Sequence, residues 1–290
     1  MRVFVTGATG FIGSAIVTEL LRAGHQVLGL ARSDSGAAAV ASAGADVHRG
    51  SLEDTDSLQR GAAAADGVIH TAFIHDFTDF PGAAQTDKRA IEAMTETLAG
   101  SGKPLIVTAG ALGSPPPRTE KDSPSDAIPR KSEAAGVAAV ARGVRAMVVR
   151  LAPSVHGDGD HGFVPALVKT ARERGYSTYV GDGSNRWTGV HRFDAATLYR
   201  LALEKGVAGA RYHGFAESVT VREIAEAIGR KLNVPAVSKT REEALQLLGF
   251  VGHALGIESA VDNAITRETL GWQPVQLGLL EDLERGSYFA

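Results

Sequence analysis

The chain has 290 residues and a formal net charge of −3, so it lacks the basic excess that proteins use to bind nucleic acid. Its 44% hydrophobic and 22% charged residues are typical of a soluble globular protein, and no apolar run approaches the ~18 residues that a membrane span needs. The absence of cysteine excludes disulfides and thiol chemistry.

The predicted elements begin with a strand, a glycine-rich turn and a helix. Residues 3–5 are a short apolar run typical of a buried parallel strand, and the apolar residues after the turn recur at helical spacing. Gly7 permits a positive φ, Gly10 lets a phosphate approach the backbone, and Gly13 lets the helix pack closely on the strand. Since free N–H groups at the helix start would face the anion, this context predicts a dinucleotide pyrophosphate site rather than a turn without a ligand. The predicted site comprises Gly7, Thr9, Gly10, Phe11, Ile12 and Gly13.

The second predicted strand, residues 26–30, indicates which dinucleotide is bound. In dinucleotide-binding folds the end of this strand meets the adenosine ribose. An acidic residue there would accept hydrogen bonds from the ribose and repel a 2′-phosphate, whereas a guanidinium binds phosphate. Arg32 and Ser33 therefore favour NADP over NAD. The alternative is that Arg32 is a solvated surface residue and that Asp34 contacts the ribose.

The next predicted elements are a helix over 35–44, a strand over 45–49, a helix around Leu58 capped by Asp54 or Thr55, and a strand that leads from residue 67 to 73. We expect Ser51 and Leu52 to flank the adenine, and the small residues Thr71 and Ala72 to let the backbone lie near the cofactor riboses.

Residues 74–81 show neither helical nor strand periodicity, so they predict a loop at the ligand crevice. Phe73 and Phe77 are candidate pocket walls, although packing of these rings onto the core is an equal alternative.

The first half then continues with a helix over 84–99, a strand over 103–110, a proline-rich loop over 112–129, a helix over 131–142 and a strand over 146–151. Six strands alternating with helices predict an α/β fold with a doubly wound, Rossmann-type parallel sheet. We expect residues 1–152 to form a dinucleotide-binding domain. Residues 153–290 are expected to form mainly a smaller, mostly helical substrate-binding lobe, with some segments returning to the first domain.

The second half shows four local patterns. Residues 152–159 are rich in turn formers, and residues 163–174 have helical spacing. A short strand is predicted over 187–193, with Asp194 capping the helix that follows. Thr220 and Glu223 have the spacing of a capping box.

On its motifs the chain resembles the extended and atypical branches of the short-chain dehydrogenase/reductases, which include sugar-nucleotide epimerases, dihydroflavonol-type reductases and 3β-hydroxysteroid dehydrogenase-like proteins. The motifs are Thr-Gly-Ala-Thr-Gly-Phe-Ile-Gly at 6–13, and the segments 68–72, 150–157, 190–194 and 270–274. The resemblance implies a nicotinamide cofactor across the carboxyl edge of the sheet, with Pro153 and Val155 near the nicotinamide.

The catalytic signature of that family, Tyr-x-x-x-Lys, is missing. The family also places a Ser or Thr on the fifth strand, where this chain has Thr108. No tyrosine here has a lysine four residues later, and aligning Ser132 with the family's serine places Pro129 at the tyrosine and Glu133 at the lysine. Lys131 is the nearby residue that could reach the nicotinamide ribose.

Histidine is the candidate for a substitute proton donor, because its pKa lies near neutrality. His75 lies in the aromatic loop and His156 lies just past the sixth strand. Convergence of His75, Phe77, His156 and Trp187 on one aromatic pocket would favour catalysis; the alternative for Trp187 is burial in the core.

These features favour an NADP-dependent carbonyl reductase or alcohol dehydrogenase, acting on a small, largely apolar carbonyl or hydroxyl substrate. The alternative is a non-catalytic NADP-binding sensor; an epimerase or dehydratase is less favoured because it needs a fast base. We expect no metal site and no membrane or nucleic-acid partner. The resemblance implies that helices 84–99 and 131–142 could form a homodimer interface, and intramolecular packing of their alanine-rich faces is an equal alternative. Because the chain starts directly with a strand, we expect no signal peptide and a cytoplasmic location.

Overall fold

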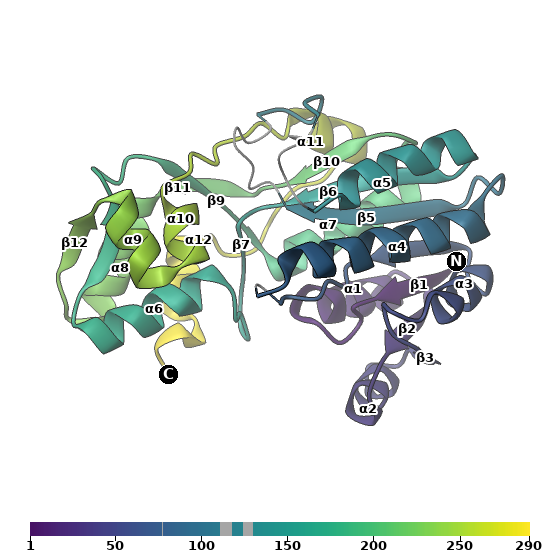
Figure 1. Ribbon diagram of the computed structural model, residues 1–290, viewed down its shortest axis with the longest axis horizontal. Coiled ribbons are helices and arrows are strands. Elements are labelled where there is room, and N and C mark those ends of the chain that lie inside the picture. Colours follow the sequence, from purple (N-terminus) through teal and green to yellow (C-terminus); the bar gives the residue numbers. More distant parts are fainter. Residues whose placement is uncertain (77, 111–117, 124–129) are drawn as a thin grey trace.

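The computed structural model describes residues 1–76, 78–110, 118–123 and 130–290, and its main feature is a seven-stranded parallel sheet with helices on both faces (Figure 1). The strands are β1 (Arg2–Thr6), β2 (Gln26–Ala31), β3 (Asp46–Arg49), β4 (Gly67–His70), β5 (Pro104–Gly110), β6 (Arg145–Leu151) and β10 (Arg211–Gly214), in the order β10-β6-β5-β4-β1-β2-β3. The predicted Rossmann-type α/β fold is confirmed.

Two helical layers cover this sheet, because successive residues of each strand point to opposite faces. Val3 and Val5 pack in the same apolar cluster as α1 (Phe11–Arg22) and α7 (Arg192–Lys205). Phe4 packs in the opposite cluster, with α3 (Thr55–Ala63) and α4 (Phe80–Leu98). The remaining helices around the sheet are α2 (Asp34–Ser42), α5 (Ser132–Ala138), the 3₁₀ helix η1 (Ala139–Arg142) and α11 (Ala264–Leu270).

The strand order positions a ligand crevice. The chain moves outward from β1 to β2 and β3, and then returns to place β4 on the other side of β1. The helices that follow β1 and β4 therefore lie on opposite faces, and the sheet opens at the carboxyl ends of these two strands.

A smaller body lies beside the sheet and contains strands as well as the predicted helices (Figure 1). Its three-stranded sheet consists of β11 (Glu217–Thr220), β9 (Arg186–His191) and β7 (Ser154–His156), and β12 (Ala236–Lys239) pairs with β8 (Ser177–Val180). Its helices are α6 (Phe163–Arg174), α8 (Val221–Leu232), α9 (Arg241–Leu248), α10 (Phe250–Leu255), α12 (Leu279–Arg285) and the 3₁₀ helix η2 (Ser287–Phe289). Within the described part of the chain, no helix combines the length and apolar character that a membrane span requires.

Three local expectations need correction. The sheet has a seventh strand, β10, which pairs with β6 and which the sequence analysis missed because Arg211–Gly214 shows neither an apolar run nor alternation. The helix expected over 84–99 begins at Phe80, since Asp79 accepts a hydrogen bond from the Gly82 N–H and caps it. Asp194 does not cap α7; its carboxylate accepts hydrogen bonds from the backbone N–H groups of residues 275 and 276.

Two predicted caps are confirmed. The Asp54 side chain accepts a hydrogen bond from the Ser57 N–H at the start of α3. Thr220 and Glu223 form a capping box at the start of α8.

Candidate functional site

The glycine-rich turn between β1 and α1 is built by close packing. Gly7 has a φ of +73°, and a Cβ there would lie 2.8 Å from the Ala72 nitrogen and from Thr71 Oγ1. A Cβ on Gly13 would lie 1.9 Å from the Gly7 carbonyl oxygen. Only glycine therefore lets α1 start directly above the turn and beside the end of β4.

The start of α1 suits an anion. Its N-cap is Gly10, which has no side chain to accept hydrogen bonds from the first-turn N–H groups, and the first turn contains no acidic residue. These donors and the positive end of the helix dipole point to the crevice. The predicted pyrophosphate residues Thr9, Phe11 and Ile12 lie in this turn and at the start of α1.

The carboxyl ends of β2 and β3 carry two arginines. Arg32 is exposed, directly after β2. Arg49 ends β3, in register with Ala31, and its guanidinium donates 2.6 Å hydrogen bonds to the Ser33 carbonyl oxygen and to the Asp34 carboxylate. Asp34, the alternative ribose ligand, is therefore paired with a cation. The sequence analysis missed Arg49, although the adjacency of β2 and β3 in a parallel sheet could have identified it.

The other adenine-side predictions lie close to this edge. The Ser33 hydroxyl caps α2 by accepting a hydrogen bond from the Gly36 N–H at 3.1 Å. Ser51 is half-buried and Leu52 is buried against the cluster that includes Leu30. Both roles at the adenine remain predictions.

A buried polar network runs beneath the predicted nicotinamide end. Thr6 Oγ1 is hydrogen-bonded with His70 Nδ1 at 2.8 Å, and His70 Nε2 is 3.2 Å from Asp87 Oδ1. Ser132 donates to the other oxygen of Asp87 and accepts a 2.7 Å hydrogen bond from Arg130 Nε. Although burial opposes it, hydrogen bonding to His70 and Ser132 and the charge of Arg130 lower the pKa of Asp87. Asp87 is therefore a buried anion that holds Arg130.

Arg130 lies at the end of this network and was not considered in the sequence analysis. Its Nη2 donates a 3.2 Å hydrogen bond to the Thr108 carbonyl oxygen and is 3.7 Å from Asp87 Oδ1. The guanidinium lies over the ring of Phe73, 4.1 Å from the centroid. Burial lowers the pKa of Arg130 and Asp87 opposes that change. The side chain is 20% exposed, so a partly desolvated cation lies at the carboxyl end of β5.

Thr108 contributes its carbonyl oxygen to Arg130 and points its hydroxyl elsewhere. Thr108 Oγ1 donates to the His70 carbonyl oxygen and is also hydrogen-bonded with Tyr199 Oη, both at 2.7 Å. Burial raises the pKa of Tyr199, so this phenol stays protonated and serves as the donor to Thr108. The expected hydrogen bond from Thr108 to a carbonyl substrate would compete with these two partners.

Glu133, which aligns with the family's lysine, lies in a buried cluster of ion pairs. It is buried, accepts hydrogen bonds from Arg150 at 2.9 and 2.5 Å, and accepts a third from Arg211 at 2.6 Å. This ion-paired carboxylate ties α5 to β6 and β10. Lys131 is the N-cap residue of α5, and its role at the ribose remains a prediction.

His75 joins Arg130 at the Phe73 ring, whereas His156 lies apart. The His75 ring meets Phe73 edge-on, with centroids 5.3 Å apart. His75 is exposed on one side, and its partial desolvation together with the charge of Arg130 lowers its pKa. His156 is 0% exposed, its Nδ1 is 2.9 Å from Asp282 Oδ2, and its Nε2 has no hydrogen-bond partner among the described residues.

The predicted convergence on one aromatic pocket is wrong for Trp187. This side chain is 1% exposed, donates a 2.8 Å hydrogen bond to Ser154 Oγ and packs edge-on against Phe163. Burial in the core of the smaller body, the alternative for this residue, is what the structure has. Phe77 lies outside the described residues.

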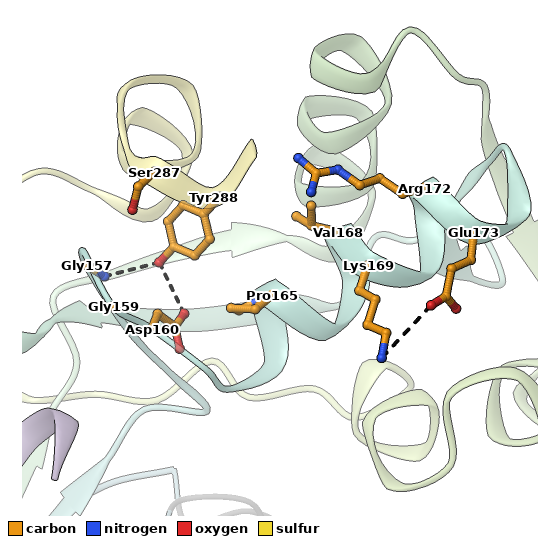
Figure 2. A pocket seen from close by; sticks show the side chains of 10 residues that line it. All are labelled: Gly157, Gly159, Asp160, Pro165, Val168, Lys169, Arg172, Glu173, Ser287 and Tyr288. Atoms are coloured by element: carbon orange, nitrogen blue, oxygen red, sulfur yellow. Dashed lines mark hydrogen bonds and ion pairs between the residues drawn. The ribbon is translucent and has the colours of Figure 1, made fainter. Parts of the chain in front are cut away.

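A cavity of about 510 Å³ lies in the smaller body, between α6 and the C-terminal residues (Figure 2). In Figure 2 the Tyr288 hydroxyl accepts a hydrogen bond from the Gly157 N–H and donates one to Asp160, both at 3.1 Å. Burial raises the pKa of Asp160. None of the residues predicted for catalysis or cofactor binding lines this cavity. Its residues are Gly157, Gly159, Asp160, Pro165, Val168, Lys169, Arg172, Glu173, Ser287 and Tyr288.

Pro153 and Val155 lie on either side of the start of β7, at the junction of the two bodies. Val155 is half-buried and packs against the same cluster as α1 and α7. Their predicted place beside the nicotinamide is consistent with this position and remains a prediction.

The chain was compared with protein families and with known proteins, and both comparisons found matches. Residues 3–121 match the model of the NAD dependent epimerase/dehydratase family. An uncharacterized protein of Schizosaccharomyces pombe is 46% identical, with both chains covered completely. A UDP-glucose 4-epimerase of Mycolicibacterium smegmatis is 30% identical over 98% of this chain and 97% of the relative. A 2-alkyl-3-oxoalkanoate reductase of Stenotrophomonas maltophilia is 26% identical over 82% of this chain and 78% of the relative.

Among solved structures, a dTDP-glucose 4,6-dehydratase of Streptomyces venezuelae with bound NAD superposes with a TM-score of 0.75. It is 22% identical and covers 98% of this chain and 95% of its own. This similarity shows the fold.

Proposed function

The chain belongs to the NAD dependent epimerase/dehydratase family, within the extended short-chain dehydrogenase/reductases, and from this membership we propose that it is an NADP-dependent carbonyl reductase. In the reverse direction it would oxidise the corresponding alcohol. The substrate would be small and largely apolar. The observation that carries the proposal is Arg130, a partly desolvated cation held at the carboxyl edge of the sheet in a chain that lacks the Tyr-x-x-x-Lys signature.

The residues at the crevice fit a dinucleotide. The uncapped start of α1 would receive the pyrophosphate. The nicotinamide supplies the hydride, and this chain's residues position it and stabilise charge.

Two features support NADP over NAD. Arg32 and Arg49 lie at neighbouring strand ends, where a 2′-phosphate would lie beside the ribose. The nearby carboxylate of Asp34 is paired with Arg49, so its negative charge is offset. A guanidinium pair of this kind suits a dianionic phosphate.

Reduction needs a group that stabilises negative charge on the carbonyl oxygen. We assign this role to Arg130, because a guanidinium fixed by Asp87, Ser132 and the Thr108 carbonyl is preorganised and partly desolvated. His75 contacts the same Phe73 ring and is the proton donor we favour over the fully buried His156. The proton would pass from the imidazolium to the oxygen of the substrate as the hydride arrives.

Epimerisation and dehydration are less well supported, because the base they require is absent from the aligned positions. Glu133 is held in ion pairs with Arg150 and Arg211. The similarity to a 2-alkyl-3-oxoalkanoate reductase supports a carbonyl substrate. The similarity to a UDP-glucose 4-epimerase makes UDP-glucose the compound with which to test for epimerase activity.

The test is NADPH oxidation with a panel of alicyclic, aromatic and 3-oxo-carboxylic ketones, with UDP-glucose assayed in parallel. Turnover of a ketone with NADPH and no interconversion of UDP-glucose is the expected result. Micromolar NADPH binding without turnover of any carbonyl would contradict catalysis and support the cofactor-sensing alternative.

A further inference from the structure

Arg192 connects the starts of two helices that lie side by side on one face of the sheet. It is the first residue of α7, which packs along α1. Its Nη2 donates a 3.1 Å hydrogen bond to Ser14 Oγ in the first turn of α1. Its Nη1 donates a 3.0 Å hydrogen bond to the Asp158 carbonyl oxygen. The guanidinium is therefore fixed at the carboxyl edge of the sheet, where both helices begin.

The guanidinium stacks on the ring of Phe11, a residue of the glycine motif. Its central carbon lies 4.6 Å from the ring centroid of Phe11, the first residue of α1, and 5.2 Å from that of Phe193. The His161 ring meets the same Phe11 ring edge-on, at 5.8 Å. Residues far apart in sequence thus surround the turn that binds the diphosphate under the proposed function.

Nothing described around Arg192 neutralises its charge directly. No carboxylate among the described residues lies within 4 Å of its nitrogens, and its Nε is buried without a hydrogen-bond partner. The positive ends of α1 and α7 add to the charge. Burial lowers the pKa of Arg192, partly offset by Asp158. An anion bound next to this partly buried cation would offset its charge.

We propose that Arg192 clamps the cofactor pyrophosphate from the side of the smaller body, opposite the backbone amides of α1. This inference rests on the proposed dinucleotide site and adds a residue to it. A diphosphate suits the position, because a guanidinium donates to phosphate oxygens in a planar fork and this one stacks on the side chain of Phe11, the first residue of α1. Arg192 reaches the α1 turn directly after β9, which belongs to the sheet of the smaller body.

The experiment compares Arg192→Met with the unaltered protein, using NADPH and two ligands that each contain only part of it. NADPH is titrated by its fluorescence, and 2′-phospho-ADP-ribose and adenosine 2′-monophosphate are measured by displacement of NADPH. The first two contain the pyrophosphate, and the third keeps only the adenosine and the 2′-phosphate. We expect Kd to rise about tenfold to hundredfold for the first two and less than about twofold for the third.

The matched control is Arg200→Met. Arg200 lies on α7 and contacts α1 through Glu19 at 2.7 Å, like Arg192, but further along both helices. This variant should leave all three Kd values within about twofold. Ser14→Ala, which removes the hydroxyl that holds Nη2, should give a smaller loss with the same ligand selectivity, and it provides the test if Arg192→Met is poorly folded in thermal unfolding.

An equal loss for all three ligands, or no loss for NADPH, would overturn the clamp while leaving the dinucleotide site intact. A loss confined to NADPH, with unchanged 2′-phospho-ADP-ribose, would place Arg192 at the nicotinamide or the substrate and overturn the clamp as well. Failure of the unaltered protein to bind either NADPH or NADH would overturn the proposed function and the clamp together.

Discussion

The guanidinium of Arg130 lies over the face of the Phe73 ring, 4.1 Å from its centroid. Phe73 follows β4 and Arg130 precedes α5, so this contact joins two loops at the carboxyl edge of the sheet. The ring holds the cation by the attraction of its π face and shields it from water. In sequence, Arg130 directly follows Pro129, the residue aligned with the family's tyrosine.

Arg130→Met should lower kcat for ketone reduction by about tenfold to a thousandfold, the range expected when one preorganised charge donor is lost. The Kd for NADPH should change by less than about threefold, as should KM. Arg222→Met is the control, because Arg222 also lies over an aromatic ring, that of Tyr179, on a distant surface. Arg130→Lys should recover part of the rate. An unchanged kcat in Arg130→Met would refute the electrostatic role.

Arg32→Ala and Arg49→Ala should each raise the Kd for NADPH about tenfold, since each removes a charged hydrogen bond to the 2′-phosphate. The Kd for NADH should stay within about twofold. Arg2→Ala removes an arginine of β1 that pairs with Asp46 of β3 in the same sheet, and it should affect neither value. Equal losses for NADPH and NADH would count against the NADP preference.

The rate of ketone reduction should fall as pH rises, because His75 must be protonated to act as the donor. Burial and the positive charge of Arg130 both disfavour the imidazolium, so the pKa of His75 lies below its ordinary value of 6.5. The midpoint of the pH–rate profile should therefore lie below pH 6.5. His75→Gln should remove this dependence, and Arg130→Met should move the midpoint upward. A profile in His75→Gln identical to that of the unaltered protein would exclude this histidine as the donor.

Glu133→Gln should destabilise the fold by about 3–5 kcal/mol, because it leaves two guanidinium groups at a buried site without their anion. Urea unfolding provides the measurement. Glu226→Gln removes an exposed ion pair within α8 and should cost less than about 1 kcal/mol. Similar losses in both variants would show that the Glu133 ion pairs contribute little.

The elements that define the cofactor crevice could be predicted from sequence because their signals are local. The glycine spacing, the apolar strand at residues 3–5 and the helix cap at Asp54 each depend only on residues a few positions away in the sequence. The β10 strand could not be predicted in this way, since Arg211–Gly214 shows no alternation and acquires its pairing only from β6.

The candidate site was predicted less completely, because its cations are defined by distant partners. Arg130 is held by Asp87 and Thr108, and Arg49 lies near the ribose side only because β3 pairs with β2. Asp194 has the sequence position of a cap, but the loop at residues 275 and 276 uses its carboxylate. Trp187 and His156 are polar-aromatic residues near a strand end, yet the packing of the smaller body buries them.

The late position of β10 in the chain has a consequence for biosynthesis. During translation, β6 emerges with one side unpaired, and its partner is not made until residue 214 has been added. The same delay applies to Tyr199, which reaches Thr108 from α7. A nascent chain that has completed β6 therefore exposes an apolar edge strand to solvent or to chaperones, and ribosome-bound fragments ending before residue 211 should be more sensitive to protease and to aggregation than longer ones.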